Sequence, residues 1–393
     1  MANNLNKIFG LILVTAVCAA ASAASAADPT SREYPYLYKS TRAMGMGGAY
    51  TAIGGRVDTL FYNPAGLSNI PKDKGWEVNL LNISAESDEN GMKFARDLQN
   101  ALNTGDLNGN GSSSDDRVIA VNSVFNKYMG EPLHVRVADF SSFGKNGDSM
   151  AFGIGALASG RLDAMPHQGF GPQGLLETNA DITYGAIGGV SIPLGKDVFG
   201  GVSIKSLHRE SVIHDFTPRE LVDNFNTLDK LITDDLKKKG GAVGFDAGMI
   251  WKIDQKSWWR PSLGLSAMNI GDLDFKAAGS IPMTVNAGFA INPAISSIRS
   301  LVVGIDYVDV LNNFSQDKDM AKRIRFGTEL QLFDINTAEV SLRAGVYESY
   351  PTLGLDLRVL TFLFSYTMYS EEIGAYAGQA KDTRHLLTFN FGW

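Results

Sequence analysis

The chain has 393 residues, of which 42 are Gly and 10% are aromatic, and it carries a formal net charge of −7. The negative charge argues against nucleic-acid binding, and a single cysteine, Cys18, in a stretch that we expect to be removed argues against disulfides and thiol chemistry. Beyond residue 27, no apolar run reaches the length of a transmembrane helix.

The first predicted element is a secretory signal peptide over residues 1–27. Lys7 is the only charged side chain before an uncharged run at 8–27, whose apolar first half is followed by Ala and Ser alone. This order of charge, apolar stretch and small residues is typical of a cleaved signal. An uncleaved anchor helix is the alternative, because the run is about long enough to span a bilayer, but its second half suits that role poorly.

Apolar and polar side chains alternate in many segments after residue 74. In the last segment, Leu387, Phe389, Phe391 and Trp393 alternate with polar or small residues. Period-two alternation is typical of β-strands, and about ten residues suffice for a strand to cross a membrane. The opposite faces carry charged residues or Gly, which suits lipid outside and a wet, charged lumen. The alternative, a soluble sandwich, would bury the apolar faces between two sheets.

The predicted fold is all-β: a 14-stranded antiparallel transmembrane β-barrel over residues 75–393, preceded by a hatch segment and carrying helical external loops. Short turns alternate with longer loops, which matches periplasmic turns, external loops and two periplasmic termini. We expect strands near 75–85, 132–142, 148–160, 178–192, 198–208, 241–253, 260–270, 282–291, 300–310, 322–333, 339–347, 352–358, 360–370 and 383–393.

All five Trp residues fall at strand ends that this topology places on the periplasmic side. Indole prefers the boundary between membrane and water. We therefore expect an inner interface girdle formed by Trp76, Trp251, Trp258, Trp259 and Trp393. The barrel-assembly machinery is expected to recognise the strand that ends at Trp393.

Residues 28–74 contain no good strand and too much Gly for a long helix. Such a backbone can make close turns in a narrow space, so we expect this segment to fold back into the lumen as an N-terminal hatch. The expected hatch residues are Gly45, Gly47, Gly48, Asn63, Pro64 and Ala65. Their glycines lack the spacing and the strand–helix context of a dinucleotide site.

The pieces Gly-Met-Gly-Gly-Ala at 45–49 and Asn-Pro-Ala-Gly-Leu at 63–67 resemble the N-terminal signature of FadL/TodX-type outer-membrane transporters. The likeness looks closest to the TraF-like and PorV-like relatives and extends over most of residues 40–393, without the loops. It implies a monomeric outer-membrane channel, in contact with lipid, for passive uptake of molecules like long-chain fatty acids or aromatic hydrocarbons. The alternative is a PorV-like or TraF-like barrel that binds protein cargo or scaffolds an envelope or secretion assembly. A polar diffusion pore is disfavoured by the expected hatch.

Two predicted external loops, 86–131 and 208–240, carry amphipathic helical patterns. In the second, Thr217 and Glu220 form a capping-box pattern at a helix start. The apolar faces must pack on each other or on the barrel rim, or surround an apolar ligand. Packing is the simpler interpretation of any single residue, whereas the family resemblance implies a substrate-binding external groove. Its residues would be Phe94, Leu98, Leu221, Phe225, Leu228 and Ile232.

The family resemblance also implies a lateral exit through a kinked third strand. The matching positions are Phe152, Gly153 and Gly155, and Gly within a strand weakens pairing and permits a bend. Tight packing of these glycines against the hatch is the alternative.

Other chemistry has little support in the sequence. Residues 106–111 match half of an EF-hand loop, but Arg117 stands where a bidentate Glu is expected, so a solvated loop is the simpler reading. Hydrolase and metalloprotease motifs are absent and the five His residues are scattered, so we expect no enzyme, no metal and no cofactor. Inward charges such as Arg323, Arg325, Glu329 and Arg343 are expected to line and gate the lumen.

Overall fold

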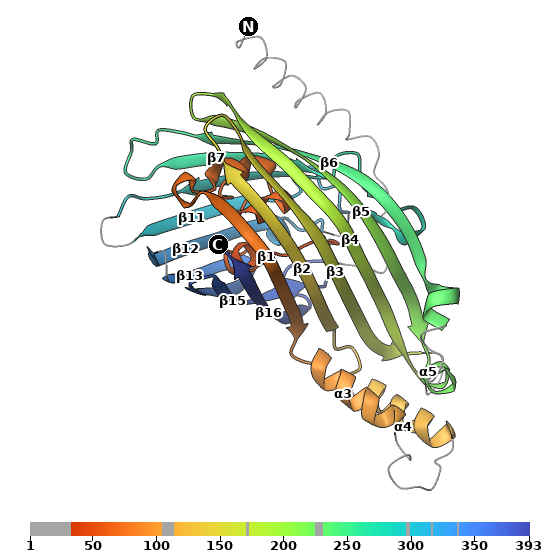
Figure 1. Cartoon of the computed structure of the whole chain (residues 1–393). Coiled ribbons are helices and arrows are strands. Elements are labelled where there is room, and N and C mark those ends of the chain that lie inside the picture. The colour runs from red at the N-terminus through yellow and green to blue at the C-terminus, as the bar shows by residue number, and fades with distance from the viewer. Residues whose placement is uncertain are drawn as a thin grey trace.

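A computed structural model describes residues 33–103, 114–169, 173–224, 231–295, 299–315, 317–335 and 338–393 (Figure 1). Within these residues, fourteen antiparallel strands close into a barrel, because β1 pairs with β2 on one side and with β16 on the other. A separate two-stranded sheet joins β8 (Leu273–Asp274) to β9 (Ser280–Ile281) in the connection between β7 and β10.

The barrel wall follows the order of the sequence. Its strands are β1 (Trp76–Asp88), β2 (Leu133–Asn146), β3 (Ala151–Gln168), β4 (Gly174–Gly195), β5 (Val198–Phe216), β6 (Lys238–Lys252), β7 (Pro261–Met268), β10 (Thr284–Ile291), β11 (Ser300–Tyr307), β12 (Ile324–Ile335), β13 (Ala338–Tyr347), β14 (Tyr350–Val359), β15 (Phe362–Glu372) and β16 (Lys381–Gly392). The predicted fourteen-stranded antiparallel barrel is therefore confirmed.

One side of the barrel is taller than the sequence predicts (Figure 1). The expected external loop 161–177 is mostly strand, since β3 runs to Gln168 and β4 begins at Gly174. Likewise β5 continues to Phe216, inside the expected loop 208–240. The reason is that the alternation persists: Arg161 is buried inside the barrel while its neighbour Leu162 is exposed outside.

The two faces of the wall differ in the way the alternation predicts. On β6, Val243 and Phe245 are 58% and 53% exposed, whereas Asp246 is 2% exposed. On β16, Leu387 points outward and Asn390 is buried inside. Apolar side chains outside and polar ones inside are the reverse of a soluble protein and suit a barrel surrounded by lipid. Among the described helices, none combines the length and hydropathy needed to cross a membrane.

The segment before β1 lies inside the barrel, drawn in orange in Figure 1. It consists of α2 (Thr41–Gly45), η1 (Val57–Phe61), η2 (Pro64–Asn69) and η3 (Lys72–Lys74), joined by buried turns. We call residues 33–74 the hatch. η2 starts where the Asn63 side chain accepts the Ala65 N–H and Pro64 occupies the first helical position.

Helices gather at the end of the barrel opposite Trp76, which we call the outer end. They are α3 (Gly91–Leu102), α4 (Ser114–Lys127) and α5 (Pro218–Asp223), followed by a π-helical turn η4 (Leu231–Leu236). The predicted cap is present, because Thr217 Oγ1 accepts the Glu220 N–H at 3.1 Å. Shorter elements near this end are η5 (Lys276–Ala278) and α7 (Met320–Arg323).

Candidate functional site

The hatch separates two spaces in the lumen. On its outer side is a pocket of about 80 Å³, and on its inner side is a vestibule of about 1210 Å³. Tyr38 lines both spaces. The thin partition between them is therefore part of the hatch itself.

The outer pocket is walled largely by aromatic rings. Tyr34, Tyr36 and Tyr62 come from the hatch, while Phe314 and Tyr347 come from the outer connections and the wall. The Tyr34 ring lies edge-on to Phe314 with 5.5 Å between centroids, and its hydroxyl donates to the Pro282 carbonyl at 2.7 Å. Aromatic walls with their hydroxyls already hydrogen-bonded favour an apolar guest.

Two cationic groups of the pocket are paired with carboxylates beside it. Lys205 Nζ lies 2.7 Å from Asp246 and donates to Asn269 at 2.6 Å. The Arg325 guanidinium lies 3.8 Å from the Tyr347 ring centroid and 2.9 Å from Glu348. These pairings hold the polar walls in place without a ligand.

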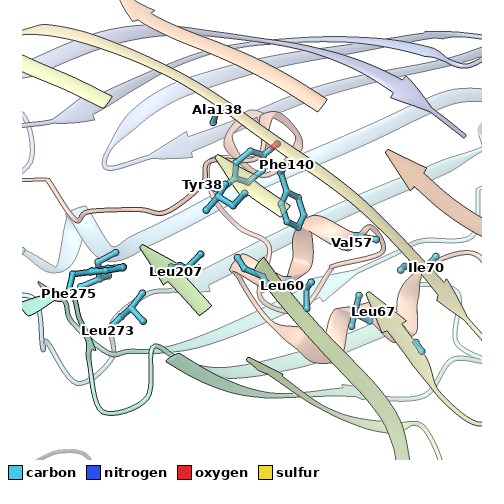
Figure 2. Close-up of a cluster of buried hydrophobic side chains, with 14 of the residues drawn as sticks. Tyr38, Val57, Leu60, Leu67, Ile70, Ala138, Phe140, Leu207, Leu273 and Phe275 are labelled. Carbon is cyan, nitrogen blue, oxygen red and sulfur yellow. The ribbon is translucent and has the colours of Figure 1, made fainter. Parts of the chain in front are cut away.

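An apolar cluster connects the hatch to the tall side of the wall (Figure 2). Phe140 of β2 meets Phe61 at 4.7 Å and Tyr38 at 5.6 Å between centroids. Val57 and Leu60 from η1 are fully buried in the same cluster. Burial of this apolar area, at roughly 25 cal/mol per Å², holds the hatch against β2–β5.

On the opposite side, the hatch touches the wall backbone to backbone. Gly47 has φ +60°, and a Cβ placed there would lie 2.4 Å from the Phe326 carbonyl oxygen and 2.5 Å from that of Val346. A Cβ on Gly45 would lie 3.2 Å from Gly354 Cα of β14, and one on Gly48, whose φ is +79°, would lie 3.2 Å from the Tyr347 ring. The contact and the positive φ together require glycine at position 47, and glycine also suits the tight contacts at Gly45 and Gly48, which explains the Gly-rich piece of the hatch.

The Asn-Pro-Ala piece fastens the hatch to β5–β7. Asn63 Nδ2 donates to the Thr51 carbonyl at 2.7 Å and lies 3.3 Å from the carbonyls of Met249 and Leu265. Ala65 occupies space against Gly201, where a Cβ would lie 2.3 Å from the Ala65 nitrogen. The motif therefore fixes the hatch in two ways: its backbone fits closely against the wall, and the side-chain amide of Asn63 contacts three backbone carbonyls.

Ion pairs complete the fastening on the β12–β14 side. Arg42 donates to both carboxylate oxygens of Glu329, at 2.8 and 2.7 Å, and Arg343 reaches the same carboxylate at 2.7 Å. Arg343 also forms a two-point pair with Asp356, which in turn lies 3.2 Å from Arg56 of the hatch. Sequence reasoning expected Glu329 and Arg343 in the lumen but missed their partners in the hatch.

A second ionic group holds the start of the hatch. Lys39 lies 2.8 Å from both Glu33 and Glu371, and Arg384 lies 2.9 Å from Glu33. Burial disfavours the charged form of Glu33, but Arg384 and Lys39 outweigh it and hold the pKa of this carboxyl well below its usual range. Burial likewise disfavours charged Lys39, yet Glu33, Glu371 and Glu86 raise its pKa above the usual value.

No family model and no curated protein matches the chain. Two solved structures of mutant forms of the TodX monoaromatic hydrocarbon channel do match it. Their TM-scores are 0.51 and 0.52, at 12% and 11% identity, covering 91% and 90% of this chain and 99% of each channel. The chain has the TodX-type barrel fold. The expected likeness to TraF-like and PorV-like barrels stays a prediction.

In this TodX-type barrel, the expected groove residues do not line the two lumenal spaces. Phe94 and Leu221 are buried in a cluster of the outer helices with Phe125 and Phe216, and Leu98 and Ile232 pack against that cluster. Phe225 and Leu228 lie outside the described residues. The external groove stays a prediction, whereas the described part of its helices forms a packed cap.

The expected lateral-exit residues lie on β3. Gly153 faces Val57 and Leu67 of the hatch, Gly155 faces Phe140, and Phe152 meets the ring of Trp76. β3 pairs with β4 along its whole length and with β2 from Ala151 to Ala164, in both cases without a register shift. In this closed state the wall has no opening at β3, and a lateral exit there stays a prediction for a changed conformation.

The expected girdle residues lie at the inner end of the TodX-type barrel. Trp76 begins β1, Trp251 is near the end of β6, and Trp393 follows β16. Trp258 and Trp259 lie in the connection between β6 and β7. All five side chains are between 40% and 71% exposed, so their indoles are available to the membrane boundary.

One group of described residues has the spacing of metal ligands: Glu33, His134 and Asp163. Arg384 approaches Glu33, and Arg161 lies 3.3 Å from Asp163, so cations of the chain already balance these carboxylates. We therefore interpret these three residues as part of the ion-pair network that holds the hatch to the wall. Residues 106–111, which match half of an EF-hand loop and for which a solvated loop is the favoured interpretation, lie outside the described residues.

Proposed function

We propose that the protein is an outer-membrane channel for passive uptake of hydrophobic small molecules. The observation that carries the proposal is the aromatic pocket above the hatch, inside a barrel whose outer face suits lipid. The TodX-type fold supports it, because the matching structures are channels for monoaromatic hydrocarbons. No enzymatic role is proposed.

Within this function, the pocket favours a compact aromatic ring over a long chain. Its volume of about 80 Å³ is of the order of a single ring, and apolar cavities of about 150 Å³ are known to take up benzene. A ring would need only a modest widening between Tyr34, Phe314 and Tyr347. A fatty acid chain would need the hatch to move first.

Binding of radiolabelled toluene to purified protein in detergent tests the proposal. Phe314 is 1% exposed beside Tyr34, so Phe314→Asp places a carboxylate in the pocket and is expected to weaken binding at least about tenfold. Tyr376→Ala, at a 59% exposed aromatic in an outer connection, is the control and should bind like wild type. Heat-modifiable migration checks that each variant forms a barrel. Equal binding by all three proteins would contradict the proposed pocket.

A second candidate is a barrel that binds a protein partner or scaffolds an envelope assembly. The close backbone contacts of the hatch favour it, since they seal the lumen, and Met92 and Ile119 on the outer helices are 67% and 68% exposed. A photo-crosslinker at Ile119 that forms one discrete protein adduct in cells, together with no toluene binding, would favour this candidate. Toluene binding without an adduct would favour the channel.

A further inference from the structure

Two arginines face each other on the inner side of the tall wall. Arg136 of β2 is directly opposite Arg161 of β3, and their side chains are 4% and 6% exposed. Arg209 of β5 points into the same region and is 7% exposed. Like charges directly opposite in a sheet are destabilising, so this arrangement requires compensation.

The described carboxylates compensate only part of this charge. Asp181 Oδ2 lies 2.8 Å from Arg161 Nη2 and 3.1 Å from Arg209 Nη2, so one oxygen serves two guanidinium groups. Among the described residues, four buried nitrogens of these three arginines have no hydrogen-bond partner: Arg136 Nε, Arg136 Nη1, Arg161 Nη1 and Arg209 Nε, although Arg161 Nη1 lies 3.3 Å from Asp163 Oδ2. Buried donors on charged groups without a partner are costly, and this cost is largest for Arg136.

These three guanidinium groups line a small cavity. Its volume is about 10 Å³, and it is closed on the lumen side by Tyr36, Leu37 and neighbouring hatch residues. This volume is about that of one water-sized sphere. A water molecule could accept hydrogen bonds there but would leave the excess positive charge uncompensated.

Glu86 is the nearest alternative partner within the wall, because it is opposite Arg136 in the pairing of β1 with β2. Its Oε1 is already engaged by the Tyr369 hydroxyl and by His134, which is 3.1 Å away, whereas its Oε2 has no hydrogen-bond partner. Pairing with Glu86 would serve Arg136 alone and leave Arg161 and Arg209 as they are. A ligand in the cavity can accept hydrogen bonds from all three arginines at once.

We propose that Arg136, Arg161 and Arg209 form a binding site for one small monovalent anion of chloride size. The anion reduces the repulsion between the facing arginines and accepts hydrogen bonds from their unpartnered N–H groups. Since residues 35–37 of the hatch line the same cavity, the bound anion also ties the start of the hatch to β2–β5. The site does not depend on the proposed transport function.

Unfolding of the purified barrel in potassium chloride and in potassium gluconate, at equal ionic strength, tests the site. Gluconate is too large for the cavity. Chloride should stabilise wild type saturably, and at ten times its Kd it should raise the ratio of folded to unfolded protein about elevenfold. Arg136→Gln and Arg209→Gln should lose this difference between the salts. Arg358→Gln, at a lumenal arginine paired with Glu339 on the inner side, should keep it.

Crystals of wild type grown in bromide provide a measurement that does not depend on how the variants fold. An anomalous peak between the three guanidinium groups is expected. Absence of that peak, equal unfolding of wild type in the two salts, or an undiminished chloride effect in Arg136→Gln would each overturn the proposal.

Discussion

The two spaces separated by the hatch differ in size and in chemistry. The outer pocket, about 80 Å³, has a mostly apolar wall with seven aromatic rings beside six charged residues, whereas the inner vestibule, about 1210 Å³, is lined by many charged side chains, among them Lys72, Glu77 and Arg260. Per unit of buried area, an apolar solute gains more free energy in the first space than in the second, whose lining is about half polar. The outer face of the hatch is therefore the place where a hydrophobic molecule would stop.

For the proposed channel, this contrast predicts that the hatch, and not the external cap, controls passage. The hatch is held by glycine contacts on β12–β14, by the amide of Asn63, by the aromatic cluster and by two ionic groups. Weakening these attachments should connect the two spaces. Changes in the external helices should leave them separate.

The largest effect is expected for Gly47→Val. The added side chain would meet carbonyl oxygens of β12 and β13 at 2.4–2.5 Å, and φ is +60°. Overpacking and left-handed strain together are expected to destabilise the seated hatch by about 4 kcal/mol or more. Conductance across planar bilayers should rise because the hatch no longer closes the lumen.

Gly75→Ala is the matched control for this backbone strain. Gly75 has φ +75°, but a Cβ there meets nothing within 4 Å. The Gly75→Ala variant should therefore carry the strain of a positive φ without a steric clash, and it should keep the low conductance of wild type. Equal conductance of Gly47→Val and wild type would argue that the glycine contacts do not seal the lumen.

A somewhat smaller effect is expected for Arg42→Met. The change removes a two-point ion pair with Glu329 and leaves that carboxylate to Arg343 alone. Removing one partner of a buried ion pair costs at least about 3 kcal/mol of stability. Because Arg343 still pairs with Glu329, we expect a loss near this lower limit. Hydrogen exchange of the hatch amides should accelerate, while Arg358→Met, which does not touch the hatch, should leave them slow.

Acid should release the start of the hatch. Glu33 has a lowered pKa, so its stabilising contribution is complete above the ordinary value of 4.5 and is lost progressively as the pH falls from there through the lowered pKa. Lys39 has a raised pKa, so its contribution is present below the ordinary value of 10.5 and is lost only as the pH rises beyond it. Conductance should therefore stay low down to pH 4.5 and increase well below it. In Glu33→Gln this increase of conductance at low pH should be smaller. An unchanged increase would show that other carboxylates cause it.

The sequence predicted the wall better than the contents of the barrel, for a physical reason. Strand alternation is local, so fourteen strands could be counted from neighbours in the chain, and even the underestimated β3 failed only at its end. The fastening of the hatch is not local: Lys39 and Glu371 are 332 positions apart. A buried ion pair between distant residues leaves no periodic pattern, although an isolated inward charge such as Asp356 between Leu355 and Leu357 indicates that some partner exists.

The same limit explains the external helices, and it supplies the prediction with the smallest expected effect on binding. Amphipathic spacing identified the apolar faces of α3 and α5 but could not say whether they cover a ligand or each other. Because Phe94 is 6% exposed in the packed cap, Phe94→Ala should destabilise the cap by about 3–5 kcal/mol, seen as faster proteolysis of the outer helices. Toluene binding should change by less than about twofold, since distant sites couple weakly. A loss of binding as large as that expected for Phe314→Asp would move the ligand from the lumenal pocket to the external groove.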